Sequence, residues 1–286
     1  MTAPLVIAQV TDIHLGFDPG NADEFNRQRL DATLGALTRM TPLPDLLLAT
    51  GDLVDRGDAE SYAVVREAFG GLPFPVLYCM GNHDDRTNFA SVFPELGDGD
   101  FVHYVHDVAG LRLVVIDTLE DGRHGGGFCT ARAAWLTARL AEAPDTPTII
   151  VMHHPPVEAG IEWMNTDPRE DWVETFAATI AGHDQVRGII CGHLHRSVTA
   201  QWEGITVAIC ASTAPQVALE LAPIDADQPD QRPMIVADPP AYALHRWNGA
   251  QLVTLFETAD DHVVLARFDE RMQPLVRSLL AERPVG

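Results

Sequence analysis

Apolar runs rich in valine, isoleucine and leucine recur along the first two thirds of the chain, each about as long as one strand. Runs that are apolar at nearly every position are typical of strands buried on both faces of a sheet. Six such runs predict six strands. They are Leu5–Val10, Leu46–Thr50, Pro75–Cys79, Leu111–Asp117, Thr148–Met152 and Val186–Cys191.

Stretches with helical periodicity lie between these runs. In the first stretch we expect Asn21 to cap a helix that carries Leu30, Leu34 and Leu37, with Glu24 as its capping-box partner. The other predicted helices are Ala59–Phe69, Ala131–Glu142 and Trp172–Ile180. Alternating strands and helices predict an α/β fold in which helices cover a sheet.

After Gly192 the pattern changes to short alternating strands separated by turn residues, which predicts hairpins. A proline- and aspartate-rich segment, residues 221–240, interrupts them and is expected to form an irregular insertion, as a cap or a subunit contact. We expect a single domain over residues 1–286. The predicted late strands are Val198–Trp202, Ile205–Cys210, Ala243–Trp247, Gln251–Phe256 and His262–Phe268.

Composition narrows the possible partners and the cellular location. The net charge of −22 argues against a nucleic-acid polymer or an anionic membrane as partner. The sequence contains no apolar stretch of the length that a membrane span needs, and its first residues have no basic region, so we expect neither a membrane span nor a secretory signal. The four cysteines are scattered without CxxC spacing, which favours reduced thiols and a cytoplasmic location.

Polar residues with metal-binding side chains follow five of the six apolar runs. Ligands in open α/β sheets bind just outside the carboxyl ends of the strands, so these residues are expected to converge. Each alone has an ordinary structural explanation, such as a turn or a helix cap. The residues are Asp12 and His14, Asp52, the triplet Asn82, His83 and Asp84, the pair His153 and His154, and the pair His193 and His195.

Carboxylate, amide and imidazole ligands without thiolate suit divalent Fe, Mn, Zn or Co better than a cysteine-rich structural zinc site. Two such ions can lie about 3.5–4 Å apart when one carboxylate bridges them. With Asp52 shared, each ion receives four protein ligands. The seven expected ligands are Asp12, His14, Asp52, Asn82, His153, His193 and His195.

Charge indicates the substrate. Two divalent ions bring more positive charge than Asp12, Asp52 and a bridging hydroxide remove, so a positive centre remains inside an acidic protein. Such a centre attracts phosphate. The hydroxide forms near neutral pH because metal ions lower the pKa of bound water.

These blocks resemble the calcineurin-like metallophosphoesterases, whose pattern is D-x-H, G-D, G-N-H-[DE], H and G-H-x-H in that order. All five blocks are present between residues 12 and 195, and the stretches GNHDD, MHHPP and CGHLH are closest to bacterial glycerophosphodiesterases and class III cyclic nucleotide phosphodiesterases. The resemblance implies a four-layer α-β-β-α sandwich of two facing mixed sheets. It also implies two metal sites, one formed by Asp12, His14, Asp52 and His195, the other by Asp52, Asn82, His153 and His193.

The resemblance further implies roles around the metals. His83 would face the scissile phosphate and protonate the leaving group, with Asp84 orienting it and Asn82 also close to the substrate. His154 is expected to be a pocket residue. Arg86 either contacts a phosphate oxygen or is a surface residue at a helix start. Relatives carry a pocket histidine before a Gln-Val pair where this chain has Pro215.

The leading hypothesis is a phosphodiesterase in which metal-bridging hydroxide attacks the phosphorus of a small diester, such as 3',5'-cyclic AMP or a glycerophosphodiester. The alternatives are a phosphomonoesterase on the same two metals, or an inactive scaffold of the same fold. We also expect a homo-oligomer, a dimer or larger.

Overall fold

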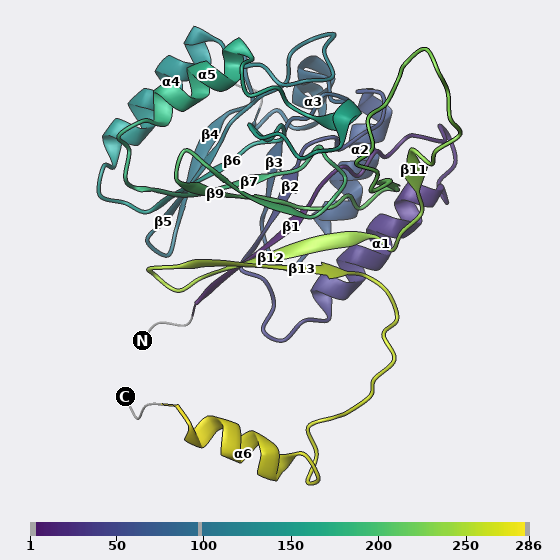
Figure 1. Ribbon diagram of the computed structural model, residues 1–286, viewed down its shortest axis with the longest axis vertical. Coiled ribbons are helices and arrows are strands. Elements are labelled where there is room, and N and C mark those ends of the chain that lie inside the picture. Colours follow the sequence, from purple (N-terminus) through teal and green to yellow (C-terminus); the bar gives the residue numbers. More distant parts are fainter. Residues whose placement is uncertain (1–3, 97–98, 284–286) are drawn as a thin grey trace.

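The computed structural model describes residues 4–96 and 99–283, and two facing β-sheets form the centre of its body (Figure 1). The first sheet has five strands in the order β13-β12-β1-β2-β3. Its first three strands in the sequence run parallel, and the last two are antiparallel, so the sheet is mixed. The strands are β1 (Leu5–Val10), β2 (Leu46–Thr50), β3 (Val76–Cys79), β12 (Ala241–Trp247) and β13 (Leu252–Thr258).

The second sheet has six strands in the order β4-β5-β6-β7-β9-β8. Its four inner strands are parallel and both edge strands are antiparallel, so this sheet is mixed as well. The strands are β4 (Tyr104–Val108), β5 (Leu111–Val115), β6 (Thr148–Val151), β7 (Val186–Cys191), β8 (Val198–Trp202) and β9 (Ile205–Ile209).

Helices cover the outer face of each sheet, which gives four layers. Leu30 of α1, Tyr62 of α2 and Phe89 of α3 are buried against the first sheet. Leu136 of α4 and Phe176 of α5 are buried against the second. The helices are α1 (Phe25–Thr38), α2 (Ala59–Gly70), α3 (Arg86–Val92), α4 (Thr130–Glu142) and α5 (Asp171–Ile180). The four-layer α-β-β-α sandwich is confirmed.

A third apolar cluster fills the space between the sheets. Ile7 and Leu48 of the first sheet meet Leu113, Ile149 and Ile190 of the second, and all five side chains are fully buried. Burial on both faces explains why the central strands are apolar at nearly every position.

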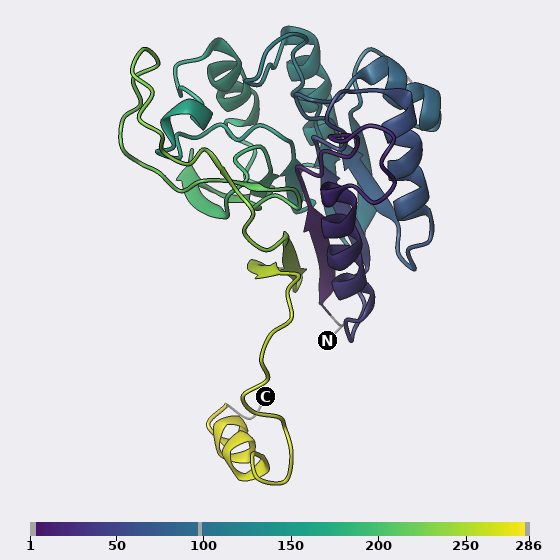
Figure 2. The same cartoon turned by 90° about the vertical axis from the view of Figure 1, so that its right-hand side faces the viewer.

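Two local predictions are wrong. Asn21 does not cap α1, which begins at Phe25, and the Glu24 carboxylate accepts hydrogen bonds from the backbone N–H groups of Gly16 and Asp18 instead. Residues 262–268 form no strand. A strand needs a partner that completes its backbone hydrogen bonds, and the structure places this segment beyond the last strand, away from both sheets (Figure 2).

Two segments extend from the sandwich. The insertion, residues 221–240, contains the short strand β11 (Ile235–Val236), which pairs with β10 (Gln216–Val217) just before it. The N–H of Ile224 in the insertion donates to Glu162 of the 3₁₀ helix η1 (Glu162–Met164). The C-terminal helix α6 (Gln273–Ala281) lies apart from the body in both views (Figures 1 and 2). Among the described residues, no helix is long and apolar enough to cross a membrane.

The carboxyl ends of the parallel strands in both sheets meet at one edge of the sandwich. The Gln9 side chain on β1 donates to the carbonyl oxygen of Cys191 at the end of β7, over 2.8 Å. The backbone N–H of Thr213 donates to the carbonyl oxygen of Thr11 over 2.9 Å. These bonds join the two sheets where the predicted ligands leave their strands.

Candidate metal centre

The first group of predicted ligands forms a compact cluster. Asp12, His14, Asp52 and His195 each offer one ligand atom, and these atoms all lie within 4.8 Å of one another. Nε2 of His14 is 3.3 Å from Nε2 of His195 and 3.6 Å from Oδ2 of Asp52. Nε2 of His195 is 3.4 Å from Oδ1 of Asp12. The structure therefore brings together the four residues that the resemblance assigned to one ion.

The second group adjoins the first through Asp52. Nε2 of His153 lies 3.4 Å from Oδ2 of Asp52, the oxygen that also faces His14. On the other side of His153, Nδ1 of His193 lies 3.0 Å from Oδ1 of Asn82, and the rings of His153 and His193 are 5.2 Å apart. These side chains come from the ends of β2, β3, β6 and β7.

Hydrogen bonds to backbone and side-chain donors hold one oxygen of each carboxylate and leave the other free. Oδ1 of Asp52 accepts from the backbone N–H of His83 at 2.8 Å. Oδ2 of Asp12 accepts from the backbone N–H of His193 at 3.0 Å and from the Thr11 hydroxyl at 2.8 Å. The remaining oxygens, Oδ1 of Asp12 and Oδ2 of Asp52, point into the cluster of imidazoles.

Buried polar atoms in this cluster lack hydrogen-bond partners among the described residues. They include Oδ1 of Asp12, Nε2 of His153 and Nε2 of His154. A buried polar atom without a partner costs about 1–3 kcal/mol, so such atoms rarely gather without a ligand to satisfy them. Carboxylate oxygens and imidazole nitrogens are the donors that divalent first-row metals prefer. The residues fit bound metal ions.

The backbone bends sharply at the ends of these strands. Five predicted ligands adopt left-handed backbone conformations, which are uncommon outside glycine. Gly81, the first residue of the motif Gly81–Asp84, also has to be glycine. A Cβ at this position would overlap the carboxylate of Asp52. The positive φ angles are 49° at Asp12, 48° at His14, 47° at Asp52, 72° at His193 and 53° at His195.

Charge is unevenly distributed over the cluster. Burial alone would raise the pKa of Asp52, but the neighbouring His153 and His14 outweigh it and hold that pKa well below its usual range. Burial, together with the charge of Asp52, raises the pKa of Asp12 to about 6. Burial opposes the charge of His153, yet the two carboxylates raise its pKa to about 9. Positive charge is therefore stabilised between Asp12 and Asp52.

Burial favours the neutral form of two other histidines in the site, His193 and His195. Burial lowers the pKa of His195 to about 4 and holds the pKa of His193 well below its usual range. A neutral imidazole has a free lone pair and is the form that binds a metal ion.

His83 lies beside the first group, with its ring 4.5 Å from that of His14. Its Nδ1 is 2.8 Å from the carbonyl oxygen of Asp55, so Nδ1 carries the proton of this bond. Asp84 is buried and accepts from the backbone N–H of Gly81 and from the Tyr62 hydroxyl, at 2.8 and 2.9 Å. The structure thus brings Asp55 against the His83 ring, while Asp84 braces the turn. That Asp84 orients His83 stays a prediction.

The two remaining predicted residues lie at different depths. His154 is fully buried, its Nδ1 is 2.8 Å from the Thr118 hydroxyl, and its ring is 4.7 Å from that of His193. The Arg86 guanidinium forms two hydrogen bonds with the buried Asp117, at 2.8 and 2.9 Å. Their contacts with a substrate stay predictions, and Arg86 is already engaged by Asp117.

Two residues near the site were not predicted from the sequence. Asp55 contacts both His14 and His83, and only its position three residues after Asp52 could have indicated it. His124 lies 3.1 Å from the side-chain nitrogen of Asn82, in the glycine-rich stretch GRHGGG. That stretch does not follow a strand directly, so the rule that identified the other residues does not apply to it.

A four-layer sandwich with carboxylates and imidazoles gathered at one edge is the arrangement of metal-dependent phosphoesterases. The chain belongs to the calcineurin-like phosphoesterase family, whose family model matches residues 5–197, and it is therefore a phosphoester hydrolase. The family predicted from the five motifs is confirmed.

The chain is similar to curated bacterial proteins over most of its length. It is 30% identical to a probable glycerophosphodiester phosphodiesterase GpdQ of Arcobacter nitrofigilis, over 87% of this chain and 91% of the relative. It is 34% identical to a probable cyclic nucleotide phosphodiesterase of Rhodopseudomonas palustris, over 72% of this chain and 74% of the relative. These relatives belong to the predicted branch.

Among solved structures, the fold is similar to that of purple acid phosphatase PPD1 from yellow lupin, with a TM-score of 0.64 and 12% identity. The similarity covers 92% of this chain and 53% of the other. It supports the fold alone.

Proposed function

We propose that this chain is a phosphodiesterase with two divalent metal ions, acting on small diesters such as 3',5'-cyclic AMP or glycerophosphodiesters. One observation carries the proposal: Oδ2 of Asp52 faces His14 at 3.6 Å and His153 at 3.4 Å, so a single oxygen adjoins both groups of ligands. The names of the relatives support the two substrate classes.

When bound, the two ions would supply positive charge that draws the phosphate and an acidified water that attacks phosphorus. The first ion would be held by Asp12, His14, Asp52 and His195, and the second by Asp52, Asn82, His153 and His193. Fe, Mn, Zn and Co all match these donors.

The other residues act on the proton and on the position of the substrate. Nδ1 of His83 donates to the carbonyl oxygen of Asp55, so Nε2 is directed away from that bond. In our proposal His83 protonates the leaving oxygen from Nε2. The ring of His154 packs beside that of His193, and in our proposal it borders the bound substrate.

The reaction type is tested by comparing bis(p-nitrophenyl) phosphate with p-nitrophenyl phosphate after loading with Mn²⁺, Zn²⁺, Co²⁺ or Fe²⁺. We expect the diester to be hydrolysed with the higher kcat/KM. Faster turnover of the monoester would favour a phosphomonoesterase, and no turnover with any metal would favour an inactive scaffold. Cyclic AMP and glycerophosphodiesters would then distinguish the two substrate classes.

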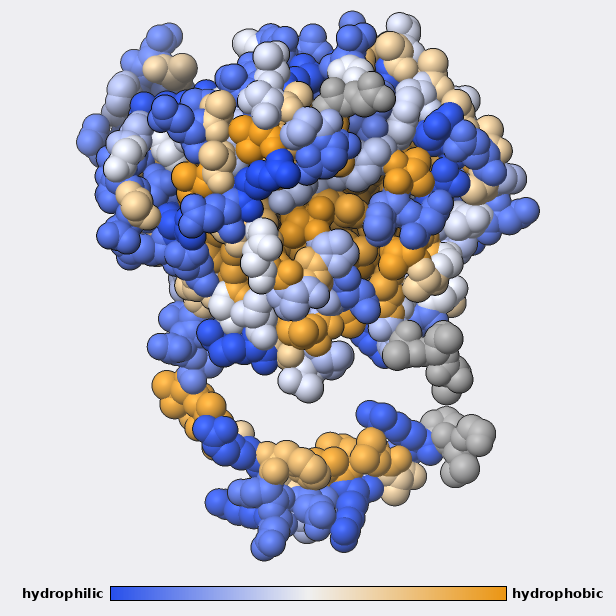
Figure 3. All heavy atoms as spheres, turned by 180° about the vertical axis from the view of Figure 1, so that it is seen from behind, coloured by the Kyte–Doolittle hydropathy of each residue, from blue (hydrophilic) through white to orange (hydrophobic). Residues whose placement is uncertain are grey.

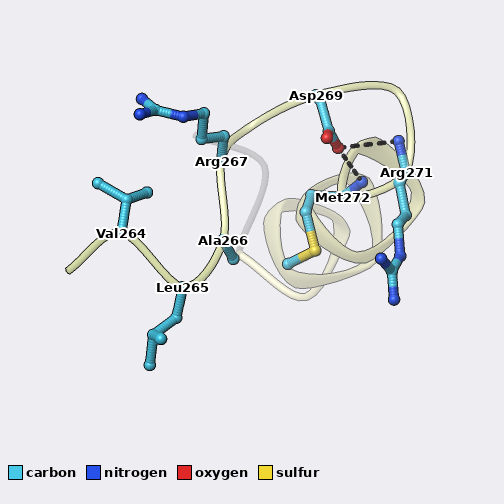
Figure 4. A pocket seen from close by; sticks show the side chains of 7 residues that line it. All are labelled: Val264, Leu265, Ala266, Arg267, Asp269, Arg271 and Met272. Atoms are coloured by element: carbon cyan, nitrogen blue, oxygen red, sulfur yellow. Dashed lines mark hydrogen bonds between the residues drawn. The ribbon is translucent and has the colours of Figure 1, made fainter.

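We also propose that the chain forms a homo-oligomer through its C-terminal arm, residues 262–281. Figure 3 shows apolar side chains along the part of the arm that faces the body, and the exposed fractions are 94% for Leu265, 73% for Phe268 and 54% for Leu279. Figure 4 shows Val264 and Leu265 pointing away from the turn in which Asp269 accepts from the backbone N–H groups of Arg271 and Met272.

The charge of the arm favours a second copy of this chain as the occupant. The arm carries three arginines and two carboxylates in a chain whose net charge is −22. An acidic body repels an anionic membrane, whereas an arm with a formal charge of +1 is not repelled by a second acidic body. Light scattering during gel filtration should give a dimer or larger for the full chain and a monomer for a chain ending at Asp261. The same number of chains per particle in the full and the truncated protein would contradict this assembly.

We place the protein in the cytoplasm. Cys79, Cys191 and Cys210 are buried and Cys129 is exposed, and all four are free thiols in the described structure, as reducing conditions would keep them.

A further inference from the structure

The side-chain amide of Asn82 has two ends of similar shape and different chemistry. Its oxygen Oδ1 carries lone pairs that a metal ion can accept, whereas its nitrogen Nδ2 carries two hydrogens and has no lone pair to offer. The side chain can turn by 180° with little change in shape. Asn82 is therefore a ligand in only one of two orientations, and the groups around it decide which one is occupied.

Different neighbours meet the two ends. Oδ1 lies 3.0 Å from Nδ1 of His193, on the side of the second group of ligands. Nδ2 lies 3.1 Å from Nδ1 of His124, at the mouth of the site. Because Nδ2 can only donate, Nδ1 of His124 accepts this hydrogen bond and the proton of the ring is on Nε2.

We propose that His124 is a positioning residue that holds the Asn82 amide in its metal-binding orientation by accepting a hydrogen bond from Nδ2. If the amide turned, the NH₂ group would face the second ion, and His124 could keep a hydrogen bond to Oδ1 only by moving its ring proton from Nε2 to Nδ1. Both changes are unfavourable. His124 thus acts on the metal through Asn82.

The loop that carries His124 is held close to the site. The Arg123 guanidinium pairs with Glu170 at 2.8 Å, and the backbone N–H of Gly127 donates to the carbonyl oxygen of Thr118 at 2.9 Å. A Cβ on Gly126 would lie 2.9 Å from Cβ of His154, so the absent side chain allows the loop to pack directly on that histidine. The path of the loop therefore fixes the distance between His124 and Asn82.

The inference rests on the proposed two-metal site, and two substitutions of similar size test it. In His124→Asn the side-chain oxygen takes the place of Nδ1, so the acceptor is kept, although the ring is lost. His124→Leu has the same branching and no acceptor. Arg123→Ala is the control, since it removes only an exposed ion pair of the same loop, which contributes little to stability, and leaves the Gly126 and Gly127 contacts that fix the path of the loop.

Mn²⁺ binding to the metal-free proteins would be followed by calorimetry, without any substrate. We expect His124→Leu to weaken the second binding step about tenfold, the lower end of the effect for outer partners of metal ligands. We expect His124→Asn and Arg123→Ala to stay within about threefold of the unmodified chain, with the first step unchanged in all three.

Two outcomes would overturn the role of His124. One is unchanged binding in His124→Leu. The other is an equal loss in His124→Asn or in Arg123→Ala, which would show that only the ring or the loop matters. If the unmodified chain itself binds a single ion, the proposed two-metal function fails instead, so the two failures are distinguishable.

Discussion

Nδ1 of His153 lies 2.7 Å from the carbonyl oxygen of Thr50, and this hydrogen bond orients the imidazole between the two sheets. A carbonyl oxygen only accepts, so Nδ1 carries a proton and Nε2 is the nitrogen that faces Asp52. In the adjacent residue, Nδ1 of His154 meets the Thr118 hydroxyl instead. The two neighbouring histidines are thus oriented by different sheets: His153 by Thr50 of the first sheet, and His154 by Thr118, which follows β5 of the second.

The different partners of these histidines predict different losses. His153→Ala should remove a ligand of the second ion and weaken its binding by more than the roughly 10–100-fold that loss of an outer partner costs. His154→Ala should leave metal content nearly unchanged and lower kcat. Metal analysis after dialysis, with activity on the same samples, would check both. The reverse ranking would exchange the two assignments.

Asp52→Asn should be the most damaging single substitution. It keeps the shape of the side chain and an oxygen for the His83 backbone N–H, but removes the charge shared by both groups of ligands. We expect loss of at least one ion and of nearly all activity. Asp85→Asn, at the N-cap of α3, is a matched control that should keep the bound metal ions and the activity. Two tightly bound ions in Asp52→Asn would refute the bridging assignment.

His83→Ala should slow substrates with poor leaving groups most. Protonation of the leaving oxygen contributes about 100- to 10,000-fold when the leaving group is an alkyl alcohol. A p-nitrophenyl leaving group needs little protonation, so its kcat should fall much less. A histidine that only braces the turn through Asp55 predicts equal losses for both kinds of ester, with metals retained.

The insertion should be dispensable for metal binding. Residues 222–233 contribute no predicted ligand, and Arg232 satisfies the carbonyl oxygens of Ala222 and Pro223 within the segment itself. Replacing residues 222–233 with a short glycine linker should leave the melting temperature and metal content close to normal, while substrate preference or assembly changes. Loss of folding would show instead that the segment belongs to the core.

His245 should make the fold sensitive to acid. Burial lowers its pKa from 6.5 to about 3, and its ring is held by Gln9 and Thr254. As the pH falls below 6.5 the unfolded chain binds a proton that the folded chain excludes, so the free energy of unfolding decreases. The loss is about 3 kcal/mol at pH 4. Urea unfolding at pH 7 and pH 4 should show a smaller difference in His245→Gln; an equal difference would rule out this cause.

The strands and the cluster of polar side chains at their ends could be predicted because both follow from a local rule. A run buried on both faces is apolar throughout, and the polar residues after Val10, Thr50 and Cys191 stand out at its end. Parallel neighbours then place those ends together. The convergence of these side chains could therefore be predicted without knowing the paths of the loops.

His124 and the C-terminal arm could not be predicted in this way. His124 reaches Asn82 because of the path of a glycine-rich loop, which depends on packing against His154. The alternation of apolar and polar residues over 262–268 resembles that of a strand, but these residues form none. A strand also needs a neighbouring strand to pair with, and the periodicity of a segment does not show whether one is present. Asn21 failed as a cap because Glu24 was engaged by a preceding loop.

Positive φ angles lower the stability of the fold at five residues that the site needs. These are Asp12, His14, Asp52, His193 and His195. Each such residue costs about 1–2 kcal/mol compared with glycine, which adopts this conformation freely. A laboratory selection for thermal stability alone would therefore enrich glycine at these positions. The selected proteins would have higher melting temperatures and would lack the side chains of the site. Libraries built to stabilise this enzyme should hold these positions fixed and seek their gains elsewhere.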